Sequence, residues 1–176
     1  ENQTLYVEAG MFVDKKAFKA TGETTSIDFK GKWLIPGLSE MHAHVPSGWN
    51  ASEEHLNRIL KLFIMHGVTN IRGMLGYPDH LPLRDRLATG ELLGPYLVTS
   101  GPSMNGNSVR SPEAAKAKAK EQKAKGYDFL KIHPGMSKAS FTALVEQATE
   151  SKMPFGGHVT ASVGVLNSVK MGQNTI

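Results

Sequence analysis

The sequence predicts an α/β fold built on parallel strands, and three observations support this. From Leu34 onward, short apolar segments alternate with segments whose apolar residues recur at helical spacing. Glycines and serines stand where those helical segments would end and begin. Strands that alternate with helices form parallel sheets joined by right-handed crossovers. About six such units fit either a doubly wound sheet or the first part of a (β/α)8 TIM-type barrel.

Each element follows from a local signal. Strands are predicted at 34–44, 68–71, 95–99, 127–133 and 154–159, and a sixth strand starts at 174–176. Helices are predicted from the N-cap Ser52 to a stop at Gly67, over 81–89, from Ser111-Pro112 onward, over 141–151 and over 161–171. No Gly-x-Gly-x-x-Gly pattern follows the first strand, which disfavours a dinucleotide-binding sheet. A barrel takes about 250 residues, so this chain supplies an incomplete one.

The residues before this pattern form a separate small β element. Residues 1–33 contain two alternating segments, Thr4–Val7 and Thr25–Phe29, separated by glycines. We therefore expect a first domain at 1–33 and a barrel domain at 34–176. Two short strands are too few to be stable alone, so the first element should pack against further strands.

Composition excludes several classes of protein. The chain has 176 residues, 40% hydrophobic and 20% charged, which is typical of a globular protein with a real core. Its positive charges are scattered, so no nucleic-acid partner is predicted, and no apolar run is long enough to cross a membrane. The absence of cysteine excludes disulfides and thiolate metal sites. Localisation stays open between cytoplasmic and exported, and assembly into a homo-oligomer is also left open.

The His42-Ala43-His44 segment is the first candidate for chemistry. Side chains on a strand alternate between faces, so His42 and His44 point the same way. Two imidazoles at the end of a buried strand are the beginnings of a metal site. The alternative is a pair of partly buried histidines that bond to backbone.

Lys131 is the second candidate. It lies within the apolar segment Phe129–Ile132, where a charged ammonium is costly unless it is paired or becomes neutral. A neutral lysine amine can react with carbon dioxide to give an anionic carbamate that bridges two cations. The alternative is a lysine that extends to the strand end and reaches water.

Further residues stand at equivalent strand ends. His158 follows two glycines that allow close backbone approach, although it could also be an ordinary core histidine. His133 should face the same side as Lys131 and, with Arg72, is a candidate for substrate binding. His55, His66 and His80 are expected on the surface. The loops after the strands carry other candidate substrate contacts, none of which selects a substrate: Trp49, Tyr77, Met104, Asn105 and Arg110.

A family resemblance connects these residues. The segment from Gly31 through Pro36-Gly37 to His44 resembles the first barrel strand of the metal-dependent amidohydrolase superfamily. The resemblance continues through His66–Thr69, Gly94-Pro95, Gly126–Ile132 and Gly157–Val159, and it is strongest to the branch of imidazolonepropionase-like proteins and Xaa-Pro dipeptidases (prolidases).

The resemblance implies a role for each candidate. His42 and His44 would bind the more buried of two metal ions, Lys131 would be the carboxylated bridging ligand, and His158 would bind the second ion. One or two divalent ions, zinc by preference, would supply a metal-bound hydroxide that cleaves an amide or peptide-type C–N bond in a dipeptide or cyclic amide. Residues 1–33 would be part of the small β-sandwich of that family.

The sequence departs from the family by omission. A sixth-strand histidine and an eighth-strand aspartate, the general base, would lie beyond Ile176, so no catalytic residue is expected within this chain and the chain alone is expected to be inactive. One alternative is a mononuclear deaminase or imidazolone-type hydrolase with an unmodified Lys131. The other is an inactive fragment or non-catalytic barrel scaffold.

Overall fold

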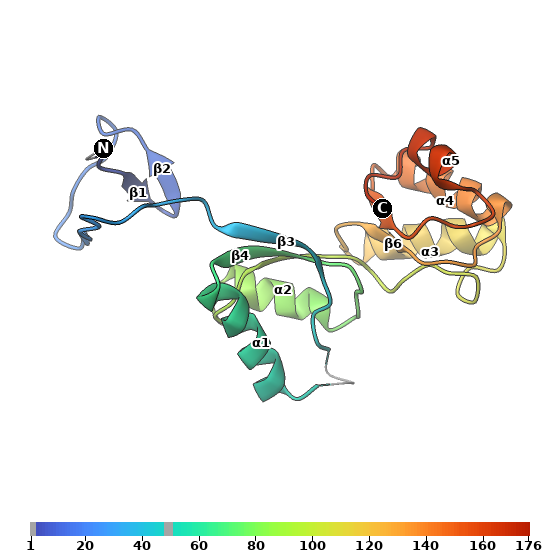
Figure 1. The fold of residues 1–176 in the computed structure, drawn as a ribbon, viewed down its shortest axis with the longest axis horizontal. Coiled ribbons are helices and arrows are strands. Elements are labelled where there is room, and N and C mark those ends of the chain that lie inside the picture. Colours follow the sequence, from blue (N-terminus) through green and yellow to red (C-terminus); the bar gives the residue numbers. More distant parts are fainter. Residues whose placement is uncertain (1–2, 48–50) are drawn as a thin grey trace. The chain divides into compact units, whose positions relative to one another are not determined.

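The computed structural model describes residues 3–47 and 51–176. It divides into two compact units, Glu1–Pro36 and Gly37–Ile176. Figure 1 shows the elements of both units.

The first unit contains an antiparallel hairpin of β1 (Tyr6–Glu8) and β2 (Met11–Val13). Ala9 and Gly10 form its two-residue turn, and both have positive φ, as the twist of a tight hairpin requires. The predicted strand over Thr25–Phe29 is wrong, because these residues form no strand in the described chain. Ile27 and Phe29 are exposed there, so the alternating pattern found neither a neighbouring strand nor a surface to pack on.

The second unit consists of parallel strands, each followed by a helix. The strands are β3 (Leu38–Ala43), β4 (Val68–Gly73), β5 (Tyr96–Thr99), β6 (Leu130–Ile132) and β7 (Phe155–Gly157). The helices are α1 (Glu53–Met65), α2 (His80–Ala88), α3 (Pro112–Ala124), α4 (Lys138–Glu150) and α5 (Val165–Lys170).

The sheet follows chain order. Strands β3, β4 and β5 pair in that order, β6 pairs with β7, and the parallel bridges Ser100–Phe129 and Met104–Ile132 connect the two sets. Backbone bonds also join the predicted sixth strand to β7, from Asn174 N–H to Phe155 O and from Gly157 N–H to Thr175 O, each 3.0 Å. The prediction of parallel β/α units is confirmed, while the sheet does not close into a barrel within the described residues.

The helix ends follow the predicted signals. Ser52 and Ser111 each accept a bond from the backbone N–H three residues on, at 3.2 Å, and so cap α1 and α3. Gly67 and Gly90 take positive φ just after α1 and α2. Helix α4 begins three residues before the predicted start, because Ser137 caps it.

Two apolar clusters support the sheet. Helices α1 and α2 lie on the same side of β3 and β4 (Figure 1), where Leu60 and Leu83 pack with Ile71 and Leu97 of the strands. A larger cluster joins α3 and α4 to β6 and β7 and includes Leu130 and Phe141, both fully buried. Among the described residues, no helix is both long enough and apolar enough to cross a membrane.

Candidate metal centre

The predicted ligands stand at the carboxyl ends of the parallel strands. His42 is in β3 and His44 follows it by one residue beyond the strand end. Lys131 is in β6, His133 follows β6 directly, and His158 follows β7 directly. Carboxyl ends of neighbouring parallel strands meet at one edge of the sheet, where barrel enzymes build their sites.

The first histidine pair sits on an exposed strand with an irregular register. The ring centroids of His42 and His44 are 5.4 Å apart, and both side chains are exposed. Glu40 pairs with Ile71 and Ala43 with Gly73, so two residues of β3 lie opposite Arg72 alone. This is a β-bulge, which turns the local side chains.

At the bulge, side-chain hydrogen bonds take the place of regular backbone pairing between β3 and β4. The His42 N–H donates to a Glu40 carboxylate oxygen at 2.7 Å. The Arg72 Nε donates to the Met41 carbonyl oxygen at 2.9 Å, and its Nη2 donates to Thr175 Oγ1 at 3.2 Å. Two polar side chains therefore hold the segment that carries His42.

Backbone bonds hold the second histidine pair. The His133 and His158 rings meet edge to face with centroids 4.8 Å apart. Met104 N–H donates to Lys131 O and His133 N–H donates to Met104 O, both at 2.8 Å, and His158 N–H donates to Ile132 O at 3.0 Å. The loop after β5 and the end of β7 are thus hydrogen-bonded to the end of β6 on its two sides.

Lys131 is fully buried, and its Nζ has no hydrogen-bond partner within the described residues. Its stem passes over Gly157, where an added Cβ would lie 2.9 Å from Lys131 Cδ and 2.4 Å from the Ile132 carbonyl oxygen. Burial, and then the nearby Arg72 charge, lower the pKa of the Lys131 amine. The buried amine is therefore biased toward its neutral form.

Electrostatics connect the two histidine pairs. Although the His42 side chain is mostly exposed, the desolvation that it does undergo, followed by the charges of Lys131 and His44, lowers its pKa. Burial, followed by the charges of Lys131 and His158, likewise lowers the pKa of His133. These shifts favour neutral imidazole, the form that binds metal.

The histidine imidazole nitrogens and the Lys131 amine, which lacks a hydrogen-bond partner within the described residues, suit a borderline-soft divalent cation. Within the described ranges 3–47 and 51–176, however, no three His, Cys, Asp or Glu side chains are grouped closely enough to hold a metal ion.

Two expectations for other residues are wrong. His80 was expected on the surface, but it is fully buried, with its ring edge-on to Tyr77 at 5.4 Å between centroids. Burial lowers the pKa of His80, against smaller raising effects of Asp79 and of the Pro46 and Val45 backbone just after His44. Met104 was expected in a substrate loop, but it is fully buried in the core. His66 is exposed as expected, His55 is half-buried, and Trp49 lies outside the described residues.

Glu40 was missed as a participant in the site, and Gly157 was expected to allow close approach of a ligand but not to pack against Lys131. A carboxylate two residues before His42 was the available signal for Glu40. No local signal shows which side chain will pack against a glycine.

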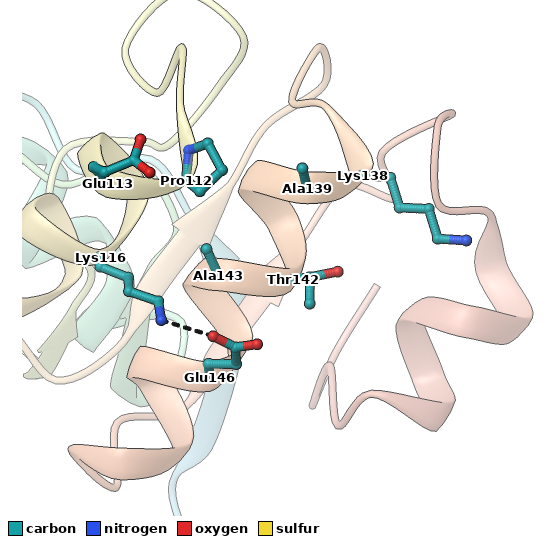
Figure 2. Close-up of a pocket in the computed structure, with 8 residues that line it drawn as sticks. All are labelled: Pro112, Glu113, Lys116, Lys138, Ala139, Thr142, Ala143 and Glu146. Atoms are coloured by element: carbon teal, nitrogen blue, oxygen red, sulfur yellow. Dashed lines mark ion pairs between the residues drawn. The ribbon is translucent and has the colours of Figure 1, made fainter.

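A separate hollow of about 790 Å³ lies between α3 and α4. Figure 2 shows the Lys116–Glu146 ion pair, 2.7 Å long, spanning it. Its other lining residues are Pro112, Glu113, Lys138, Ala139, Thr142 and Ala143. None of the predicted ligands lines this hollow.

Comparison with solved structures identifies the fold. The chain matches a bottromycin amidohydrolase with a TM-score of 0.69 and 23% identity over 80% of this chain and 32% of the other. It matches a second amidohydrolase with a TM-score of 0.75 and 18% identity over 96% and 54%. A Xaa-Pro dipeptidase, solved with methionine in its active site, matches with a TM-score of 0.63 and 18% identity over 86% and 51%.

The chain thus spans about a third to a half of the structures it matches. No family sequence model and no curated protein sequence matches it. The resemblance to the amidohydrolase superfamily is confirmed at the level of the fold.

Proposed function

We propose that this chain carries part of the metal centre of a hydrolase that cleaves an amide or peptide-type C–N bond. The observation that carries the proposal is that His42, His44, Lys131 and His158 stand at the ends of parallel strands, with the charges of Lys131, His44 and His158 all acting on His42. The structural neighbours include amidohydrolases and a Xaa-Pro dipeptidase. A divalent ion, zinc by preference, would polarise the scissile carbonyl and lower the pKa of a bound water.

Each side chain would have a distinct task. His42 and His44 would bind one ion through neutral imidazoles, and His158 would bind a second. His133, whose ring lies against His158, would contact substrate or orient that imidazole.

Lys131 would be a ligand as its carbamate. The neutral amine nitrogen would attack the carbon of carbon dioxide, so that an N–C bond forms, one C=O π bond opens to leave the negative charge on oxygen, and one N–H proton is released to solvent. Burial of an amine without a hydrogen-bond partner supports this step, because the carbamate replaces an orphaned group with an anion that a cation can pair.

Zinc titration by calorimetry tests the proposal on the chain itself. Wild type should bind zinc, and His42→Ala with His44→Ala should abolish binding at that site. His66 is exposed and lies away from the carboxyl ends of the strands, so His66→Ala is the matched control and should bind zinc as wild type does. Absence of zinc binding by the wild type would overturn the proposal.

A second measurement addresses Lys131. Protein exchanged into ¹³C-bicarbonate with zinc should show a carbamate carbon signal that Lys131→Met lacks. A wild-type spectrum without that signal at full zinc occupancy would leave Lys131 unmodified and favour a single-metal site.

A further inference from the structure

Arg72 bonds to two segments that are distant from it in sequence. It is half-buried in β4, directly opposite the bulge at Met41 and His42. Met41 has no paired residue in the β3–β4 register, and Arg72 Nε donates to its carbonyl oxygen at 2.9 Å. A side chain therefore holds the backbone immediately before the ligand His42.

The other end of the guanidinium reaches a segment distant in sequence. Its Nη2 donates to Thr175 Oγ1 at 3.2 Å. The Thr175 carbonyl accepts from Gly157 N–H at 3.0 Å, and His158 is the next residue. Arg72 is thus connected to both histidine-bearing strands.

A third contact extends toward Lys131. The guanidinium carbon lies 5.6 Å from the centre of the Phe129 ring, two residues before Lys131. This distance is within the range of a cation–π interaction. A planar, permanently charged fork is suited to hold several acceptors in one fixed geometry, which a lysine cannot do.

We infer that Arg72 is a positioning residue of the metal centre, which sets the distance between the His42 strand and the His158 strand. The Arg72 contacts support the positioning of the two strands. Its consequence for metal binding rests on the proposed function. Two of the five guanidinium N–H donors are given to Met41 and Thr175, so substrate binding, the role expected from its strand-end location, would have to use the remaining ones.

The test compares four variants. Arg72→Met removes the donors and charge but keeps the stem, and Arg72→Lys keeps a charge without the planar fork that reaches both acceptors. Thr175→Val removes only the Nη2 acceptor. Arg58→Met, on the exposed face of α1, is the matched control. Circular dichroism verifies the fold of each.

Zinc affinity and the visible spectrum of bound Co(II) are the first readouts. Arg72→Met should bind zinc about ten- to hundredfold more weakly, as loss of a group that orients metal ligands does. Its Co(II) spectrum should change, which loss of stability alone would not cause. Thr175→Val should weaken binding roughly two- to tenfold, the effect of one hydrogen bond. Arg72→Lys should recover part of the affinity, and Arg58→Met should match wild type.

Unchanged zinc affinity and an unchanged Co(II) spectrum in Arg72→Met would overturn the inference. If Arg72→Met does not fold, Thr175→Val decides by the same two measurements.

A measurement that needs no metal distinguishes failure of this inference from failure of the proposed function. If wild type binds no zinc, the proposed function fails, and imidazole NMR signals decide the role of Arg72. Joint shifts of the His42 and His158 signals in Arg72→Met, absent in Arg58→Met, would support positioning. Unmoved signals would overturn it.

Discussion

The two halves of the candidate centre are built differently. Strand β3, which carries His42, is exposed along nearly its whole length, whereas all three residues of β6 and of β7 are buried. Close packing holds Lys131, and backbone bonds hold His133 and His158. Side-chain bonds from Glu40 and Arg72 hold His42.

This difference indicates which half is preorganised. Packing in a dense interior resists displacement, because each moved atom loses contacts. Hydrogen bonds at an exposed edge compete with water and are worth less. We therefore expect the β6–β7 half to be rigid by itself and the β3 half to depend on a few polar contacts.

A matched pair of leucines gives the largest expected contrast. Leu130→Ala in β6, where the side chain is fully buried, should lower the free energy of unfolding by about 2–5 kcal/mol. Leu38→Ala in β3, where the side chain is 55% exposed, should cost less than about 1 kcal/mol. Urea unfolding measures both, and similar costs would contradict the comparison.

Alanine substitutions at two glycines test how closely the β6–β7 half is packed. Gly157 and Gly172 both have positive φ, so alanine at either position incurs roughly 1–3 kcal/mol of backbone strain. Only at Gly157 would the new Cβ also meet Lys131 and the Ile132 carbonyl, since Gly172 faces open space. Gly157→Ala should therefore destabilise the chain more than Gly172→Ala in urea unfolding. An equal loss would mean that Lys131 is not closely packed against β7.

His80 should make the β3 half sensitive to acid. Its pKa is lowered in the folded chain, mainly by burial, so below about pH 6.5 the unfolded chain binds the proton more readily. Stability is then complete above that pH and falls as the pH drops toward the folded-state pKa. His80→Gln should reduce this slope by up to about 1.4 kcal/mol per pH unit.

The control for His80 is Leu83→Ala, a buried site on the same helix. It should lower stability at every pH and keep the wild-type slope, as measured by urea unfolding between pH 5 and 7. An unchanged slope in His80→Gln would contradict the prediction.

The smallest effect is expected at the Lys116–Glu146 ion pair between α3 and α4 (Figure 2). Both side chains are well exposed, and exposed pairs contribute little because water screens them. Lys116→Ala should leave the urea midpoint within experimental scatter, while Leu130→Ala shifts it clearly. A large shift would show that the packed half relies on its surface charges as well.

The sequence by itself determined the order of the elements and most of their ends. Serine caps at Ser52 and Ser111 and the helix stops at Gly67 and Gly90 act within a few residues, so local chemistry suffices to predict them. The alternation of strands and helices and the strand-end placement of His42, Lys131 and His158 also follow from local periodicity.

Only the tertiary structure decided which side chains meet. The strand predicted over Thr25–Phe29 lacked a neighbour, and His80 became buried beside the chain that follows His44. The bulge at Met41 and His42, the reach of Arg72 to Thr175, and the contact of Lys131 with Gly157 each join residues far apart in sequence. The physical reason is that backbone propensity is local, whereas burial and side-chain pairing depend on what the rest of the chain brings alongside.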